Sequence, residues 1–300
     1  MASSMSSPQA PFGRILTAMV TPFTADGDLD LDGAQRLAAH LIEAGCDGLV
    51  LSGTTGESPT TTDEEKTALI RAVVEAVGDR AHVIAGAGTN DTRHSVAQAV
   101  AAERAGAEGL LAVTPYYSKP PQEGVYRHFT AIADATGLPV MVYDIPGRTA
   151  TPIESETLVR LAEHDRIVAV KDAKADLGAS SWVMARTDLA YYSGDDILNL
   201  PLLSIGAVGC VSVASHLVAA DLRAMFDAYF AGEAGKARDI HRSLLPVFTG
   251  IFRTQGVITT KAALRRLGLP SGPVRLPLVD LTEQQLEVLR QDLADSGIAL

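Results

Sequence analysis

The chain has few cysteines and no long apolar run, and both shortages exclude classes of protein. Only two cysteines, Cys46 and Cys210, occur among its 300 residues. Two are too few for a disulfide framework, and their spacing matches neither a metal site nor a redox pair. No apolar run approaches the roughly eighteen residues that a membrane-spanning helix needs. We therefore expect a protein of the reducing cytoplasm with no membrane partner.

Positive charge and aromatic side chains are also scarce. The 25 Lys and Arg residues stand against 36 Asp and Glu residues, which leaves a formal net charge of -11. A field of this sign repels nucleic acid, so we expect no such partner. Aromatic residues make up 5% of the chain, whereas hydrophobic residues of all kinds make up 47%. A core of Ala, Val, Leu and Ile is typical of buried parallel strands packed against helices.

Several catalytic motifs are missing as well. The seven histidines show no HExxH or other paired-ligand spacing, so the sequence does not support a catalytic metal. Asp195 and Asp196 have no third acidic neighbour in sequence, and we expect them to support a strand end by hydrogen bonding. No GxSxG nucleophile turn occurs either.

What the chain does contain is a regular alternation of short β-branched runs and longer amphipathic stretches. The eight strand candidates are residues 15–23, 48–53, 82–88, 109–115, 139–145, 167–173, 190–196 and 209–215. This pattern predicts an α/β fold, an eight-stranded parallel TIM barrel with right-handed crossovers. The alternative is an open doubly wound sheet, but its usual glycine-rich turn is incomplete, because Asp91 stands where a third glycine should follow Gly86 and Gly88.

The length fits one barrel of about 250 residues with an extension. We expect residues 1–12 to be a disordered tail, residues 13–232 to form the barrel, and residues 233–300 to form a C-terminal helical extension. Helical periodicity recurs in this extension over 234–252, 259–267 and 282–295, and a proline-rich stretch at 269–277 interrupts it.

Active sites of such barrels lie at the carboxyl ends of the strands, and Lys171 ends the sixth strand candidate. It follows the apolar run 167–170 directly. Burial beside such a run disfavours the charged ammonium and lowers the lysine pKa, and a neutral amine can attack a carbonyl. The structural alternative is a lysine that snorkels towards solvent or pairs with a nearby acid such as Asp144 or Asp172. Taken alone, this strand favours that alternative.

Other strand ends supply the groups that imine chemistry needs. Tyr143 and Thr54 carry hydroxyls that can relay protons. Backbone N–H groups of the Thr54-Thr55-Gly56 turn suit a carboxylate, and Arg148 has the planar fork for another. Singly, each has a structural explanation: a core tyrosine, a capped turn that Glu57 braces, and a surface ion pair.

Two motifs resemble those of the dihydrodipicolinate synthase and N-acetylneuraminate lyase superfamily. The first spans residues 48–58, GLVLSGTTGES, with Glu65 beyond it, and the second joins Tyr143-Asp144-Ile145-Pro146 to Lys171-Asp172-Ala173. The resemblance covers nearly the whole chain. It implies that Lys171 forms a Schiff base with pyruvate, and that Tyr143, Thr54 and Tyr117 form a proton relay in which Tyr117 reaches a neighbouring subunit's site.

The resemblance also assigns binding roles. It implies that Thr55 holds the pyruvate carboxylate, that main-chain groups near Gly194 and Val211 line the pocket, and that Arg148 holds the carboxylate of L-aspartate 4-semialdehyde. It further implies a homotetramer, a dimer of dimers, and no metal or organic cofactor. Arg148 and Thr54 favour the synthase branch, because the neuraminate lyases commonly lack the arginine and carry serine in place of the threonine.

Alternatives to the synthase activity are another pyruvate-dependent class I aldolase or lyase of the superfamily, or a non-catalytic carboxylate-binding barrel. A silent barrel need not keep Lys171, Tyr143 and Tyr117 together, and all three are present. A pyridoxal-phosphate enzyme also uses a lysine, and visible absorbance of the purified protein would reveal it.

Lysine-inhibited members of the superfamily have a histidine where Lys66 stands and an acid where His94 stands. Lys66 places a cation near the ligand's own ammonium groups, and His94 does not supply the missing negative charge. Pro59 stiffens the loop that precedes Lys66, although Asn90 and Tyr116 match the pattern of the inhibited members. We therefore expect lysine to inhibit this chain weakly or not at all.

Overall fold

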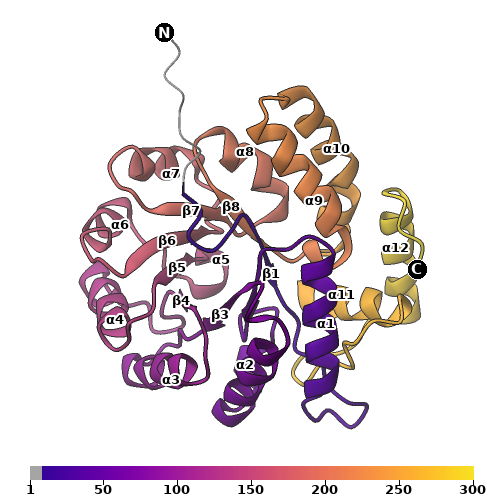
Figure 1. The fold of residues 1–300 in the computed structure, drawn as a ribbon, viewed down its shortest axis with the longest axis horizontal. Coiled ribbons are helices and arrows are strands. Elements are labelled where there is room, and N and C mark those ends of the chain that lie inside the picture. The colour runs from indigo at the N-terminus through magenta and orange to yellow at the C-terminus, as the bar shows by residue number, and fades with distance from the viewer. Residues whose placement is uncertain (1–8) are drawn as a thin grey trace.

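The computed structural model describes residues 9–300 and contains a closed barrel of eight parallel strands paired in chain order, β1 to β8 (Figure 1). The strands are β1 Ile15–Ala18, β2 Gly48–Leu51, β3 His82–Gly86, β4 Gly109–Val113, β5 Val140–Asp144, β6 Ile167–Asp172, β7 Ala190–Ser193 and β8 Gly209–Ser212. The predicted fold class is therefore confirmed. Each strand lies within its predicted range and most end earlier, because the polar residues at the carboxyl ends leave the ladder to form loops.

Helices follow the strands and cover the outside of the barrel. They are α1 Leu31–Glu43, α2 Asp63–Val77, α3 Thr92–Arg104, α4 Gln122–Asp134, α5 Pro146–Thr149, α6 Ser155–Leu161, α7 Leu177–Met184, α8 Asn199–Ser204 and α9 Ser215–Phe230, with short 3-10 turns η1 Ser58–Thr60 and η2 Asp196–Leu198. Side chains of Asp30, Asp91 and Asp176 cap helix N-termini by accepting backbone N–H bonds. Within the described part of the chain, no helix is long and apolar enough to cross a membrane.

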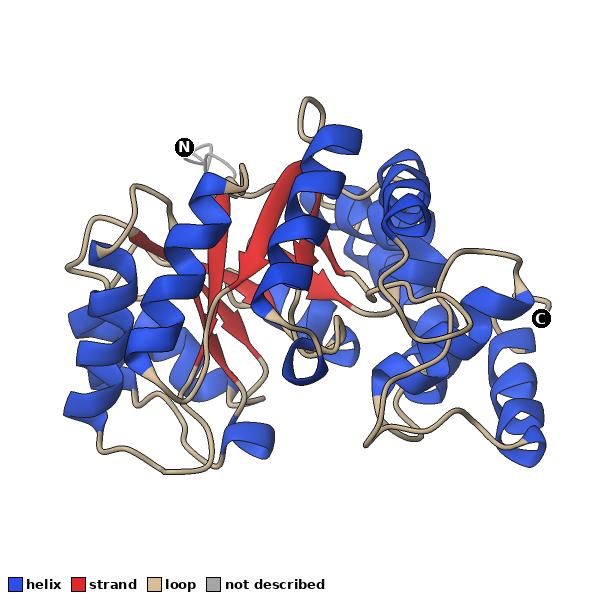
Figure 2. Cartoon of the chain, turned by 90° about the horizontal axis from the view of Figure 1, so that it is seen from below, coloured by secondary structure: helices blue, strands red, loops and turns tan. Residues whose placement is uncertain are grey.

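The C-terminal extension contains α10 Ala234–Gly250, α11 Gly256–Arg266 and α12 Glu283–Ala294. Figure 2 shows these helices grouped at one side of the barrel. Helix α10 packs against α9 and α12, and α11 contacts both as well. The three helices lie at the positions that the periodicity predicts, and the proline-rich stretch forms an irregular connection between α11 and α12.

The predicted tail over residues 1–12 falls mostly on residues 1–8, which lie outside the described residues. Phe12 corrects the predicted boundary, because its side chain is buried under the barrel. Its backbone N–H donates to the Tyr192 hydroxyl, and its ring lies 6.4 Å from the Tyr192 ring. Packing against the barrel therefore begins before residue 13.

The register of β5 and β6 brings the two expected catalytic side chains together. Tyr143 pairs with Lys171, and Asp144 pairs with Asp172. Because neighbouring residues on a strand alternate between the two faces of the sheet, each pair shares one face. The barrel interior thus receives the tyrosine and the lysine, and the helix-covered face receives the two acids.

Candidate active site

Lys171 is buried, with 5% of its surface exposed. Desolvation lowers its pKa to about 8; the negative charge of Asp196 opposes this shift and the Arg148 charge adds to it. The structural alternative of an ion pair with Asp144 or Asp172 is not what the structure shows. Asp144 pairs with Lys174 at 3.2 Å, and Asp172 accepts from Ser180. Among residues 9–300, no carboxylate lies within ion-pairing distance of the Lys171 ammonium.

Tyr143 lies directly beside this amine. The Lys171 Nζ atom is 4.2 Å from the centroid of the Tyr143 ring. Burial raises the pKa of the phenol to about 12, although the Arg148 charge and the Thr54 hydroxyl lower it in part. Its hydroxyl therefore keeps its proton at neutral pH. A protonated phenol next to a lysine that loses its proton easily is suited to general acid catalysis.

The threonine loop, Gly53 to Glu57, forms the second side of the site. Thr54 is partly exposed and Thr55 is buried. The loop folds back on itself, because the Glu57 N–H donates to the Thr54 carbonyl at 3.2 Å and Glu57 has a left-handed φ of 55°. The Glu57 carboxylate contacts Lys261 and the backbone of Arg275, so Glu57 ties the loop to the C-terminal extension.

A cavity of about 550 Å³ opens above these residues. Thr54, Tyr143 and Arg148 line it, so the structure brings three of the predicted site residues to one space. Lys171 lies beneath, against the Tyr143 ring. Arg148 is exposed on α5 and, within the described chain, forms no ion pair, so its guanidinium is available to an anionic ligand.

Gly194 and Val211 differ in how closely the structure relates them to Lys171. Gly194 follows β7, and a Cβ atom there would lie 3.0 Å from the Lys171 Cε atom. A side chain at this position would therefore press against the lysine, and glycine leaves that space open. Val211 lies on β8, pairs with Leu16 and is buried. Within the described chain, the Lys171 ammonium forms no hydrogen bond or ion pair with Val211.

Tyr117 is not brought to the site within a single chain. It lies in the loop after β4 with a positive φ of 76°, and 89% of its surface is exposed. Its neighbour Tyr116 lines the cavity instead. An exposed tyrosine held in a left-handed conformation is costly in an isolated chain.

Two acids were predicted to support the end of β7, and Asp196 does so. Its carboxylate accepts from the backbone N–H groups of Val213 at 3.0 Å and Ala214 at 2.9 Å. These bonds join the ends of β7 and β8. Asp195 accepts from the Ile197 N–H and caps η2.

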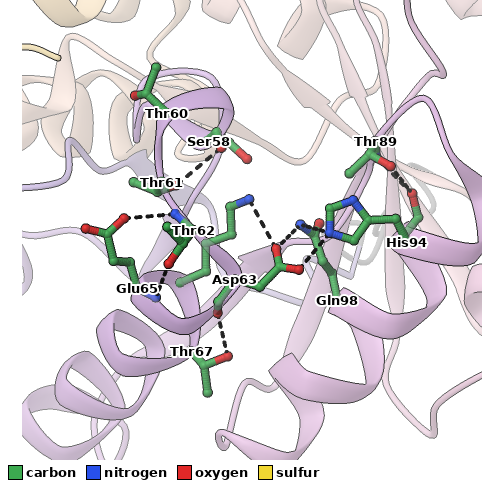
Figure 3. Close-up of polar contacts among 12 residues, drawn as sticks. Ser58, Thr60, Thr61, Thr62, Asp63, Glu65, Thr67, Thr89, His94 and Gln98 are labelled. Carbon is green, nitrogen blue, oxygen red and sulfur yellow. Dashed lines mark hydrogen bonds and ion pairs between the residues drawn. The ribbon is translucent and has the colours of Figure 1, made fainter. Parts of the chain in front are cut away.

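The start of α2 also lines the cavity, through Thr62, Asp63 and Lys66, and Figure 3 shows the polar contacts made there. Thr62 and Glu65 form a reciprocal capping box there. The Asp63 carboxylate accepts from Gln98 at 2.9 Å and lies 2.7 Å from His94 Nε2. It also lies 3.7 Å from the ammonium of Lys66. Burial tends to raise the pKa of Asp63, but the bonds from Gln98 and His94 lower it overall.

Sequence reasoning missed the contacts that the C-terminal extension makes with the threonine loop. Lys261 of α11 and Arg275 of the following connection both reach Glu57. Lys261 lies between Thr260 and Ala262 in a helical stretch that ends in Arg265 and Arg266, so its sequence neighbours do not mark it as buried. A buried lysine in such a stretch is the one signal that points to a partner of opposite charge.

Comparisons with known proteins agree along the whole chain. The model of the Dihydrodipicolinate synthetase family matches residues 11–296. The 4-hydroxy-tetrahydrodipicolinate synthase 2 of Streptomyces coelicolor is 70% identical over 98% of this chain and 99% of its own, and the 4-hydroxy-tetrahydrodipicolinate synthase of Acidothermus cellulolyticus is 69% identical over 96% and 94%. The crystal structure of DHDPS from Cyanidioschyzon merolae with lysine bound is 44% identical, with a TM-score of 0.93 and coverage of 95% and 98%.

Proposed function

The chain belongs to the dihydrodipicolinate synthetase family, and on this premise we propose that it condenses pyruvate with L-aspartate 4-semialdehyde through a Schiff base on Lys171. Its activity is the synthesis of 4-hydroxy-tetrahydrodipicolinate, a step towards diaminopimelate and lysine. This activity stands over the alternatives of another aldolase or a silent barrel, because relatives of up to 70% identity carry the synthase name. The observation that carries the residue assignment is the buried, unpaired Lys171 beside the Tyr143 ring.

The first half of the reaction uses the lowered pKa of Lys171. The neutral amine attacks the ketone carbon of pyruvate, and the resulting carbinolamine loses water to give an imine. Tyr143 donates the proton that the departing oxygen needs, and Thr54 and Tyr117 return protons to it. Loss of a proton from the methyl group then gives an enamine attached to Lys171.

The second half forms the carbon–carbon bond. The enamine carbon adds to the aldehyde of the second substrate, whose oxygen takes up a proton and becomes a hydroxyl. The imine on Lys171 is restored in the same step. The substrate's amino group then attacks this imine carbon and displaces the Lys171 amine, which closes the ring and frees the enzyme.

Binding roles follow from the charges and N–H groups around the cavity. Thr55 and the backbone of its loop hold the pyruvate carboxylate. Arg148 holds the carboxylate of the semialdehyde, because it lines the cavity and no acid of the described chain neutralises it. Main-chain groups near Gly194 and Val211 complete the pyruvate pocket.

We also propose that the enzyme works as a homotetramer, a dimer of dimers, in the cytoplasm. The support for assembly is Tyr117, which is 89% exposed and absent from its own chain's cavity. Contact with a second copy would cover this ring and bring its hydroxyl to the neighbouring site. The two cysteines are free and buried, as a reducing compartment allows.

Two assays test the proposal. A coupled assay with pyruvate and L-aspartate 4-semialdehyde measures the condensation. Borohydride reduction with pyruvate converts the imine to a stable amine, and peptide mapping should find the adduct on Lys171. An adduct on another lysine, or none at all, overturns the assignment.

A further inference from the structure

We propose that the C-terminal extension positions the threonine loop, with Lys261 and Arg275 acting as positioning residues through Glu57. The inference rests on the proposed function, because its readout is pyruvate binding at Lys171. Neither Lys261 nor Arg275 lines the active-site cavity, so any effect on pyruvate passes through the loop.

The centre of this arrangement is a buried ion pair. The Lys261 ammonium lies 2.6 Å from Glu57 Oε1, and both side chains are 0% exposed. The Lys261 ammonium also donates a hydrogen bond to the Pro273 carbonyl at 2.9 Å. The ammonium also lies 4.1 Å from the centroid of the Phe23 ring, in the segment that follows β1. One cation therefore joins the threonine loop, the extension and the end of β1.

Arg275 contacts Glu57 as well, together with the segment that runs from Glu57 to Glu65. Its backbone N–H donates to Glu57 Oε2 at 2.8 Å. Its guanidinium donates to the Thr60 carbonyl at 2.8 Å and to both oxygens of Glu65. Glu65 belongs to the capping box at the start of α2 with Thr62, which Figure 3 shows. Both ends of the segment from Glu57 to Glu65 are thus tied to one arginine.

The position of Glu57 is transmitted to the threonines over a short stretch of backbone. The Glu57 N–H donates to the Thr54 carbonyl at 3.2 Å, and the Thr21 hydroxyl donates to the Gly56 carbonyl at 2.7 Å. A shift of Glu57 therefore moves the residues that face pyruvate. Buried ion pairs are seldom better for stability than apolar packing, but they can fix a single arrangement of the chain. Placement of the loop is the role this geometry supports.

Two variants test whether the Glu57–Lys261 pair places the threonine loop or only stabilises the fold. Lys261→Met leaves the Glu57 carboxylate buried and unpaired. The double variant Glu57→Gln/Lys261→Met removes both charges, and the introduced amide oxygen can still accept from the Arg275 N–H. Borohydride trapping over a range of pyruvate concentrations gives the concentration for half-maximal labelling of Lys171. We expect that concentration to rise about tenfold in both variants, as displacement of a positioning group by a fraction of an ångström does, while the labelling rate at saturation falls much less.

Controls weaken the extension without touching the loop. Arg253→Met breaks an ion pair with Asp292, and Leu289→Ala opens a cavity under α12. Both should lower the melting temperature and leave half-maximal labelling unchanged. Arg275→Met gives an independent arm, because the Lys261 pair stays in place, and we expect a rise of about threefold.

The outcomes are distinguishable. If the parent enzyme is not labelled by pyruvate, the proposed function fails and not only this inference. If the parent is labelled but the folded double variant and Arg275→Met need no more pyruvate than the parent, the extension does not position the loop. A matching rise in the Leu289→Ala control would show that general destabilisation accounts for the effect, which also overturns the inference.

Discussion

Two buried lysines of this protein have pKa values lowered to about 8, yet they differ in what surrounds them. Burial is the largest cause in both. Lys261 has an acid at 2.6 Å, from Glu57. Lys171 has no such partner in the described chain, and its neighbour is the Tyr143 ring. The comparison teaches that burial alone makes an ammonium easy to deprotonate, whereas the presence or absence of a partner separates a structural lysine from a nucleophile.

The largest expected effect comes from removing the unpaired lysine. Lys171→Ala should lower condensation activity by at least roughly a thousandfold, because it removes the amine that we propose forms the imine. Lys236→Ala is a suitable control, since Lys236 is exposed and pairs only with Glu233. The coupled assay measures both variants. Substantial activity in Lys171→Ala would break the comparison at its first step.

For stability the order of the two lysines should be reversed: replacing Lys261 should destabilise the fold, and replacing Lys171 should not. Lys261→Met strands the Glu57 carboxylate and should cost about 3 to 5 kcal/mol of unfolding free energy. Lys171→Met removes a buried cation that has no partner, and we expect no loss or a gain at pH 7. That gain should shrink as the pH rises from about 8 towards 10.5, because in that range the folded lysine has lost its proton and the unfolded lysine still carries one, so rising pH favours the folded parent. Urea unfolding at several pH values measures both variants.

Equal losses of stability in the two methionine variants would contradict this contrast. They would mean that Lys171 also has a partner of opposite charge in the working enzyme. Thermal unfolding of both variants at matched protein concentration provides the control, since an assembled enzyme unfolds at a temperature that depends on concentration.

Arg148→Ala sharpens the comparison, because Arg148 is a cation that lowers the pKa of Lys171 without touching it. Desolvation is the larger cause, so imine formation with pyruvate should survive. Use of L-aspartate 4-semialdehyde should fall by about two orders of magnitude, as expected for the loss of a charge-assisted contact to its carboxylate. Separate measurement of labelling and condensation decides this. Equal loss of both steps would count against the assigned role.

The pH dependence of imine formation should be milder. With a pKa of about 8, the neutral fraction of Lys171 is roughly one tenth at pH 7 and one half at pH 8. The rate of labelling by pyruvate should therefore rise about fivefold over that range and level off above about pH 9. A rate that still climbs steeply at pH 10 would indicate an ordinary lysine.

The barrel, and the position of Tyr143 beside Lys171, could be predicted from the sequence. Strand-helix alternation predicts parallel strands whose carboxyl ends meet, so Tyr143 and Lys171 were expected on one face, and the register places them side by side. The Glu57–Lys261 pair could not be predicted, because it joins segments far apart in the chain and nothing in the sequence around Lys261 points to Glu57. Phe12 was missed because its partner, Tyr192, is equally distant.

Regulation by lysine gives the smallest expected effect and involves a third lysine. Lys66 lines the same cavity as Tyr143, and its side chain is 11% exposed. Burial lowers its pKa, and Asp63 opposes that shift. Unlike Lys171, Lys66 has an acidic partner, and that acid is already shared with His94 and Gln98. The cavity wall therefore offers a second cation and no uncommitted carboxylate to a ligand with two ammonium groups.

We accordingly expect L-lysine at millimolar concentration to leave the condensation rate nearly unchanged. Asn90 and Tyr116 line this wall as well and offer polar groups to a ligand. If the Lys66 charge repels the ligand, Lys66→His should strengthen the binding of lysine, by about 1 kcal/mol or less at this partly screened site. Initial rates and calorimetric titration of the parent and the variant test this. Saturable, sub-millimolar inhibition of the parent would show that hydrogen bonding to the ligand outweighs the repulsion from Lys66.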